Sequence, residues 1–218
     1  MHIERIAVLL EPYVDSARDE RLTADDLQRI STYIDILQRW KARINLTAIR
    51  DEEHIVTRHF GESLFAARHL FPLRSSVPSV VSGVRVADVG SGAGFPGIPI
   101  KLWAPEVLLT LIESNQKKAT FLKEVTRSLT LTDVNIQNTR AESLTGASFD
   151  VVTLRAVERF ESILPVAARL VAPEGRLALL IGQAQLAQAQ SSLPIWNWSD
   201  PVPVPKSKSR VLAIACRP

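Results

Sequence analysis

Cysteine is almost absent from this chain. Its 218 residues include only one, Cys216, near the last residue. A single thiol excludes an internal disulfide framework and any metal site built from several cysteines. Because disulfides are characteristic of oxidising compartments, this composition favours a reducing, cytoplasmic setting.

Long apolar runs and a strong excess of one charge are also missing. No stretch approaches the length that spans a bilayer, and the opening Met1–Arg5 carries an acid, so we expect neither a membrane association nor a secretory signal. The net charge is only +3. The C-terminal tail is locally basic through Lys206, Lys208 and Arg210, which could meet phosphate or could simply be solvated.

Residues 1–72 have the pattern of a helical extension. Thr23, followed by Asp25 and Asp26, resembles a capped helix start with acids in its first turn. Apolar residues then recur at helical spacing, and we expect this face to pack on the following domain. They are Leu27, Ile30, Ile34 and Leu37. A second helix is expected over about 52–70, and the segment 73–83, rich in serine and proline, is interpreted as a linker.

From residue 84 to 218 the pattern predicts alternating strands and helices. Such alternation implies right-handed crossovers and a mostly parallel sheet covered on both faces. Strands are expected at 84–89, 107–112, 134–137, 149–154 and 176–181, and the segment 195–216 is expected to add two more, one of them antiparallel. The predicted fold class is therefore α/β: a doubly wound, seven-stranded, Rossmann-like sheet with an N-terminal helical extension.

The most informative stretch is a glycine-rich turn, Asp88-Val-Gly-Ser-Gly-Ala-Gly-Phe-Pro-Gly97. A strand ends, glycines turn the chain, and a helix begins with proline in its first turn. Glycine lets the backbone approach a ligand where a side chain would clash. In a doubly wound sheet the ligand crevice lies beyond the carboxyl ends of the strands. The turn therefore predicts a cofactor site, with a tight turn beside a surface acid as the alternative.

Two acidic residues bear on which cofactor binds. Gly92, Gly94 and Gly97 spell G-x-G-x-x-G, so a nicotinamide-dependent oxidoreductase has to be weighed. Asp88 is expected at the mouth of the crevice, where its carboxylate would repel a pyrophosphate and suit the ammonium and sulfonium charges of S-adenosylmethionine. Glu113, after the second strand, is placed to bind ribose hydroxyls, which both cofactors carry. Asp88 therefore favours S-adenosylmethionine and hence a methyltransferase, whereas Glu113 supports nucleoside binding without choosing between the two cofactors.

The glycine-rich turn closely resembles that of the RsmG (GidB) family, bacterial small-subunit ribosomal RNA guanine-N7 methyltransferases. Further segments resemble family motifs in the same order, so the resemblance spans about residues 35–182. These segments are Trp40–Ile49, Arg58–Leu64, Glu113–Val125, Arg140–Glu142 and Leu154–Val157. In the second of them Glu62 stands where the family has Asp.

The resemblance implies methyl transfer from S-adenosylmethionine to N7 of guanine 527, in the usual numbering of 16S rRNA. The substrate would be 16S rRNA within the 30S subunit or an assembly intermediate. The enzyme would be a cytoplasmic monomer that needs no metal. The expected cofactor contacts are Asp88, Gly90, Gly92, Gly94, Phe95, Glu113, Ala141, Glu142 and Arg155, with Ala141 and Glu142 beside the adenine.

The chemistry requires alignment rather than acid–base catalysis. N7 carries a lone pair and no hydrogen, so we expect no general base; the protein has to align the reactants and exclude water. Arg155 is the candidate for placing the base, with a salt bridge to a local acid as the alternative. The candidate substrate contacts are Asn45, His59, Lys206, Lys208 and Arg210. For Asn45 and His59 a purely structural role is an equal or stronger alternative.

Two departures from the family concern RNA docking. Ile181 precedes Gly182 where the family usually has lysine, and the stretch after them is rich in Gln and Ala.

The sequence has no Asn/Asp-Pro-Pro-aromatic motif after the fourth strand, which argues against methylation of an exocyclic amine, and Cys216 is too close to the end to serve a cytosine-C5 enzyme. Another RNA or a small molecule as substrate, and a non-catalytic assembly factor, remain alternatives.

Overall fold

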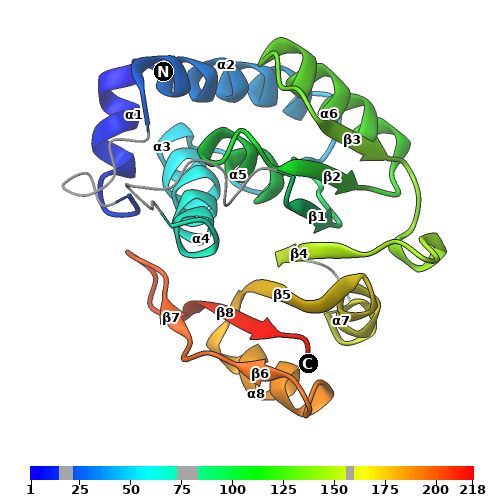
Figure 1. Ribbon diagram of the computed structural model, residues 1–218. Helices are drawn as coiled ribbons and strands as arrows, with labels where there is room; N and C mark the ends of the chain where they lie inside the picture. The colour runs from blue at the N-terminus through cyan, green and yellow to red at the C-terminus, as the bar shows by residue number, and fades with distance from the viewer. Residues whose placement is uncertain (15–21, 73–82, 156–159) are drawn as a thin grey trace.

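The computed structural model describes residues 1–14, 22–72, 83–155 and 160–218. A single sheet runs through the described chain (Figure 1). Its order is β3 (Val134–Gln137), β2 (Leu108–Ile112), β1 (Arg85–Val89), β4 (Phe149–Arg155), β5 (Val171–Gly182), β8 (Arg210–Cys216) and β6 (Asn197–Trp198), and β7 (Val202–Pro203) also pairs with β8. The first five of these are parallel neighbours. The α/β fold class predicted from the sequence is confirmed.

The end of the sheet differs in one detail from the expectation. As predicted, one strand runs against the others, because β8 pairs antiparallel with β5. The other expected strand is divided into two short segments, β6 and β7, that both pair with β8. Pro201 and Pro203 lie in this stretch, and a proline cannot donate a hydrogen bond to a neighbouring strand. The expected edge strand is therefore interrupted.

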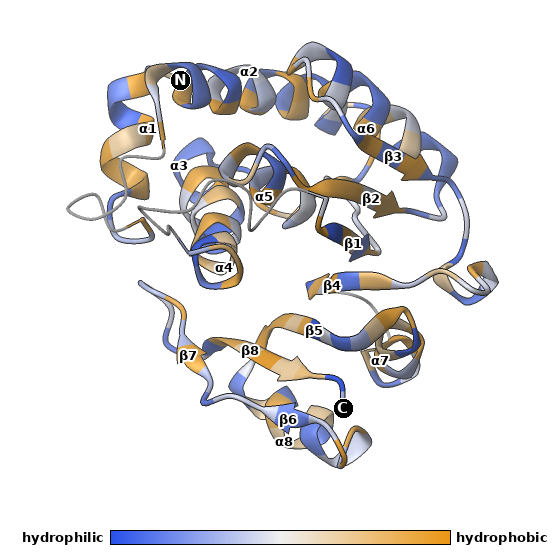
Figure 2. Ribbon diagram, in the orientation of Figure 1, coloured by the Kyte–Doolittle hydropathy of each residue, from blue (hydrophilic) through white to orange (hydrophobic). Residues whose placement is uncertain are grey.

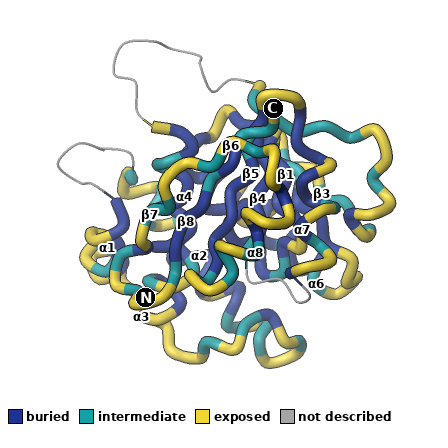
Figure 3. The backbone as a smooth tube through the Cα atoms, turned by 90° about the horizontal axis from the view of Figure 1, so that it is seen from below, coloured by how far each residue is buried: buried dark blue, intermediate teal, exposed yellow. Residues whose placement is uncertain are grey.

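Strand alternation divides the core between the two faces of the sheet. Val86, Leu109 and Val151 join one cluster, whereas their neighbours Ala87 and Val152 join the other. The first face is covered by the N-terminal helices, α5 (Gly97–Trp103) and α6 (Gln116–Ser128). The second is covered by α7 (Phe160–Arg169) and α8 (Gln183–Ser192). Figures 2 and 3 show the result: the apolar strands β5 and β8 lie in the buried interior.

The N-terminal residues form α1 (Ile3–Leu10), α2 (Ala24–Lys41), α3 (Glu52–Ile55), a π-helical segment (Val56–Gly61) and α4 (Glu62–Leu70). The predicted cap of α2 is present: Asp26 N–H donates to the Thr23 hydroxyl, and Thr23 N–H donates to the Asp26 carboxylate. The expected helix over 52–70 is found, with the π-helical turn inside it. Such turns often lie at functional sites, and this one carries Arg58 and His59.

The N-terminal helices share the core of the sheet. Ile30, Ile34 and Leu37 are fully buried in the cluster that also holds Val86 and Leu111. The Trp40 indole donates to the Glu124 carboxylate at 2.8 Å, which ties α2 to α6. The division of the chain at the linker 73–83 stays a prediction, because residues 73–82 lie outside the described residues. We propose that 1–72 and 84–218 unfold together.

This proposal predicts the effect of truncating the α2 face. Ile34→Ala removes a fully buried side chain and should lower the free energy of unfolding by about 2–5 kcal/mol. Urea denaturation followed by circular dichroism and tryptophan fluorescence should give one transition in both probes. The control is Asp35→Ala, an exposed neighbour, which should leave the midpoint unchanged. Two separated transitions in the wild type would show that the helical extension folds on its own.

Candidate cofactor and acceptor site

The carboxyl ends of the parallel strands gather most of the predicted site residues. β1 pairs with β2 on one side and β4 on the other, which makes this the point where the strand order reverses. The glycine-rich loop follows β1, Glu113 follows β2, and Arg155 ends β4. A 3-10 turn, Ala141–Ser143, comes after β3. The arrangement is that of a ligand crevice.

The glycines of the loop have different reasons to be glycine. Gly90, Gly92 and Gly94 all have positive φ, at 68°, 56° and 86°. A Cβ on Gly94 would collide with the Tyr33 hydroxyl, and one on Gly97 would lie 2.6 Å from the Leu111 side chain. A Cβ on Gly92 would meet only a backbone oxygen at 3.7 Å. Gly94 and Gly97 therefore serve packing, whereas Gly92 borders open space that a ligand can occupy.

Asp88 lies beneath this loop, which corrects the expectation that it stands at the crevice mouth. The residue is 1% exposed. One carboxylate oxygen accepts from the Thr153 hydroxyl at 2.8 Å and the other from Gly97 N–H at 3.2 Å. Burial raises the pKa of Asp88 to about 6, against the lowering effect of these hydrogen bonds. Its charge can act on a ligand only across the loop, and its first role is to hold the loop against β4.

Glu113 clamps the loop from the other side. Its carboxylate accepts from Gly92 N–H at 2.9 Å and from Asn115 N–H at 2.7 Å. The Asn138 amide donates to the Glu113 carbonyl at 2.9 Å, which joins the end of β2 to the end of β3. A carboxylate offers about four lone-pair positions, so this one can still accept from a ribose hydroxyl. Gly92 and Glu113 together thus fit a nucleoside-bearing cofactor such as S-adenosylmethionine.

The remaining cofactor candidates differ in exposure. Ala141 is buried, while Glu142 beside it is exposed. Phe95 is 7% exposed, because Tyr33 and His59 stack on its ring with centroids at 5.3 and 4.7 Å. Any contact of Phe95 with a cofactor has to use the small part that stays exposed. The contacts of these three residues with the cofactor stay predictions.

Arg155 is held by the π-helical turn rather than by the cofactor loop. Its guanidinium donates to the carbonyls of Arg58 and His59 and to the Ser63 hydroxyl. It also lies 6.0 Å from the centre of the Phe95 ring. The expected alternative for this residue, a salt bridge to an acid, is present, since Nη2 lies 3.3 Å from Glu62 Oε2. The side chain is 9% exposed, and these contacts fix the orientation of its guanidinium.

His59 connects Arg155 to the loop that follows α2. Nδ1 lies 3.3 Å from Nη2 of Arg155, which can only donate, so Nδ1 accepts and Nε2 carries the proton. Nε2 is 2.7 Å from the Thr47 hydroxyl. Burial, followed by the charges of Arg155, Arg58 and Lys41, lowers the pKa of His59 to about 3. The imidazole is therefore neutral, and both of its nitrogens have protein partners.

Glu62 is the residue that sequence reasoning missed as part of the site. Its side chain is 2% exposed and forms ion pairs with Arg58, Arg155 and Arg210. Burial raises the pKa of Glu62, and Arg155 and Arg58 oppose that shift. One carboxylate thus faces three cations, which leaves an excess of positive charge beside the crevice. The available signal was an acid between Phe60 and Leu64 on the buried face of a helix.

Tyr33 was also missed. Its hydroxyl donates to the Ala93 carbonyl inside the glycine-rich loop, and both groups are buried. The signal was its position on the same face of α2 as Ile30 and Leu37. The N-terminal extension therefore contributes directly to the shape of the cofactor loop.

The basic tail is only partly recruited to the site. Arg210 reaches Glu62, whereas Lys206 and Lys208 are exposed in the turn before β8. Asn45 is exposed in the loop after α2, where it lines a surface groove with Lys41 and other basic residues of that loop. Contact of any of these residues with substrate stays a prediction. Within the described ranges, no group of three or more His, Cys, Asp or Glu side chains could hold a metal, and no helix could cross a membrane.

Comparisons with known proteins agree with this geometry. Residues 26–200 match the family model GidB, described as rRNA small subunit methyltransferase G. Ribosomal RNA small subunit methyltransferase G of Halorhodospira halophila is 35% identical over 211 residues, covering 94% of this chain and 96% of that protein. The protein of the same name from Xylella fastidiosa (strain M23) is 38% identical over 165 residues, covering 75% and 73%.

Solved structures show the same fold at low identity. Magnesium protoporphyrin IX methyltransferase from Synechocystis PCC 6803, with bound SAM, has a TM-score of 0.65 and 16% identity. The match covers 92% of this chain and 100% of that one. The likeness concerns the fold alone.

The open side of Gly92 leads to a first prediction for the site. Gly92→Val should abolish binding of S-adenosylmethionine, because the branched side chain would fill the space beside the loop. Gly146→Val is the matched control: Gly146 also has positive φ and open surroundings, so both variants carry a similar backbone strain of about 1–3 kcal/mol. In calorimetric titration, the Gly146→Val variant should bind S-adenosylmethionine with the affinity of the wild type, and the Gly92→Val variant should not. Unchanged affinity in folded Gly92→Val would remove Gly92 from the site.

Buried Asp88 predicts a dependence of stability on pH. Its pKa is raised from 3.8 to about 6 in the folded chain, so the folded state holds the proton more tightly than the unfolded state. The resulting stabilisation is complete below pH 3.8 and is lost as the pH rises through about 6. Asp88→Asn should remove this loss, which amounts to up to about 3 kcal/mol.

Urea denaturation between pH 4 and 7 measures this difference, with exposed Asp35→Asn as the control. The asparagine can still accept from Gly97 N–H and donate to the Thr153 hydroxyl, so the loop should keep its shape. Identical pH profiles for the wild type and Asp88→Asn would contradict the buried, protonation-sensitive carboxylate.

Proposed function

The chain belongs to the GidB family, rRNA small subunit methyltransferase G, and from this membership and the geometry of the site we propose that it methylates N7 of one guanine in 16S rRNA. It is an S-adenosylmethionine-dependent methyltransferase of small-subunit rRNA. The nicotinamide alternative is thereby set aside. The glycine motif that raised that alternative has a packing role at Gly94 and Gly97.

The observation that carries the choice of N7 is the state of the titratable groups around Arg155. His59 is neutral, and its ring nitrogens bond to Arg155 and Thr47. Glu62 is ion-paired with arginines, and Asp88 is enclosed beneath the loop. Each of these groups holds another part of the site in place. Attack by N7 requires no proton acceptor, so this arrangement suits N7 better than an exocyclic amine.

The chain's residues then act by orientation. When bound, S-adenosylmethionine supplies an electrophilic methyl group on its sulfonium. Gly92 would leave room for it, Glu113 would accept a hydrogen bond from its ribose, and the loop that Asp88 and Tyr33 hold in place would border it. Arg155 places the guanine. Holding the two reactants in the correct geometry lowers the barrier to methyl transfer without acid–base chemistry.

We propose further that the substrate is the 30S subunit or an assembly intermediate, and that the enzyme is a cytoplasmic monomer. The positive charge beside the crevice suits a phosphate-rich partner. It comes from Arg58, Arg155 and Arg210, which outnumber the single Glu62. The exposed basic residues of the loop after α2 and of the turn before β8 extend it over the surface.

Arg155→Ala tests the proposal. Loss of the oriented guanidinium should lower methyl transfer about 10²-fold, the cost of a misplaced reactant. The fold should persist, because Arg58 and Arg210 still pair with the buried Glu62 carboxylate. The assay is transfer of tritiated methyl to 30S subunits that lack the modification, with primer-extension mapping of the product. Arg127→Ala, an exposed arginine on α6, is the control. Wild-type rates in Arg155→Ala would exclude this arginine, and methyl on a pyrimidine or an exocyclic amine would refute the N7 assignment.

The affinity of Arg155→Ala for the cofactor distinguishes between two possible roles of Arg155. If the guanidinium contacts mainly RNA, calorimetric affinity for S-adenosylmethionine should stay near that of the wild type. If it contacts the methionine carboxylate, that affinity should fall together with the rate.

A further inference from the structure

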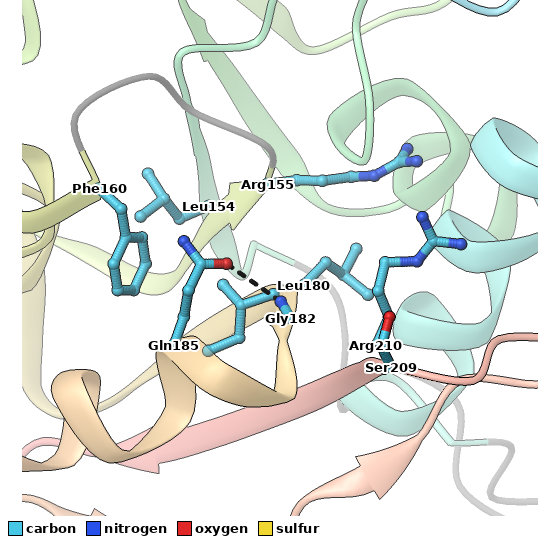
Figure 4. Close-up of a pocket in the computed structure, with 9 residues that line it drawn as sticks. Leu154, Arg155, Phe160, Leu180, Gly182, Gln185, Ser209 and Arg210 are labelled. Carbon is cyan, nitrogen blue, oxygen red and sulfur yellow. Dashed lines mark hydrogen bonds between the residues drawn. The ribbon is translucent and has the colours of Figure 1, made fainter.

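A cavity of about 310 Å³ lies beyond the carboxyl ends of β4 and β5, beside the start of α8 (Figure 4). We call it the β4–β5 pocket. Its apolar wall includes Phe160, Leu154 and Leu180, and its polar lining includes Gln185 and Arg155. Leu154 pairs with Val89 of β1 and with Leu179 of β5, so one strand separates the pocket from the glycine-rich loop. A ligand in the pocket would therefore lie next to the cofactor crevice.

The Gln185 amide is the polar group whose direction is determined. Its Oε1 accepts from Gly182 N–H at 3.1 Å, and since that backbone group can only donate, the atom facing it has to be the oxygen. The Nε2 amino group consequently points away from Gly182, toward the space between Phe160 and Leu154 (Figure 4). Among the described residues it has no hydrogen-bond partner. The pocket thus presents an oriented, unused donor beside an aromatic ring.

We propose that the β4–β5 pocket receives the acceptor guanine and that Gln185 recognises its O6 by donation from Nε2. This inference rests on the proposed function. O6 and N7 are the two acceptors on that edge of guanine, so a donor directed at O6 leaves the N7 lone pair free for the methyl group. Adenine carries an amino donor in place of O6, which would oppose the Gln185 amino group. Phe160 and the neighbouring leucines give the planar base an apolar wall.

The position of Gln185 on α8 also supports a role beyond capping. The residue is held in the first turn of the helix by its bond to Gly182, so its amino group needs little reorganisation to meet a ligand. Ile181, near the end of β5, and Gln185, on α8, both line the pocket. The proposal therefore assigns a specificity-determining role to a residue at the start of α8.

Gln185→Glu separates recognition from capping. The glutamate keeps an oxygen for Gly182 N–H and suits the helix N-terminus, so the fold should be as stable as that of the wild type in thermal melts. It replaces the amino donor by an acceptor, which would oppose O6. Gln183→Glu is the matched control, because it adds the same charge to an exposed position in the same helical turn.

The measurement compares two acceptors in otherwise identical 30S subunits: the target guanine, and 2,6-diaminopurine, which keeps N7 but has an amino donor in place of O6. On guanine, Gln185→Glu should lower kcat/KM at least about 10-fold, the factor for one hydrogen bond of ordinary strength, with unchanged cofactor affinity. On 2,6-diaminopurine its activity should rise relative to that of the wild type. Gln183→Glu should keep the wild-type preference.

The possible failures are distinguishable. If the wild type and both variants methylate guanine equally, with the same preference over 2,6-diaminopurine, the pocket assignment is wrong while the proposed function stands. If the wild type places no methyl group on guanine N7 of small-subunit rRNA, the proposed function fails and the pocket assignment fails with it.

Discussion

The buried carboxylate of Glu62 holds together parts of the chain that are far apart in sequence. Arg58 comes from the π-helical turn, Arg155 from the end of β4 and Arg210 from the start of β8. A buried carboxylate is costly to leave unpaired, so the ion pairs hold these three segments of the chain in place around Glu62. Since one acid meets three arginines, the same contact that organises the site also leaves it positively charged.

A second chain of contacts makes the helical extension part of the site. Tyr33 bonds to the glycine-rich loop at Ala93 and stacks on Phe95, and His59 stacks on Phe95 while bonding to Arg155. The aromatic rings are buried in the core cluster that continues into the sheet. A change in the N-terminal helices would consequently reach both the cofactor loop and the arginine beside it. The extension is better described as one wall of the site than as a separate module.

The roles of the two carboxylates at the crevice, Asp88 and Glu113, depend on how far each is buried. Asp88 lies near the carboxyl end of β1, a position in the sequence that is equally compatible with the mouth of the crevice and with the space beneath the loop. The structure places it beneath, where hydrogen bonds from Thr153 and Gly97 compensate for the loss of water. Glu113 remains at the edge and bonds to the loop it faces. Both acids therefore hold the loop by accepting from its backbone N–H groups, Asp88 from beneath and Glu113 from the other side.

The sequence by itself determined the fold class and the position of the glycine-rich loop, because both depend on local signals. Strand periodicity, the glycine-rich turn and the Thr23 cap act over a few residues, and all three are found where the pattern predicts them. The edge strand was predicted only in part. The prolines at 201 and 203 can be read from the sequence, but the division of the strand into two segments that pair with β8 could not be predicted from them.

Only the tertiary structure decided which residues meet. Arg58 and Glu62 are four residues apart, but the Glu62 contacts also join positions 155 and 210, and no periodicity relates those distant positions to the helix. The same holds for Tyr33 and Ala93. Packing and buried charge are properties of the assembled core, so they follow from the fold rather than from any local stretch of the chain.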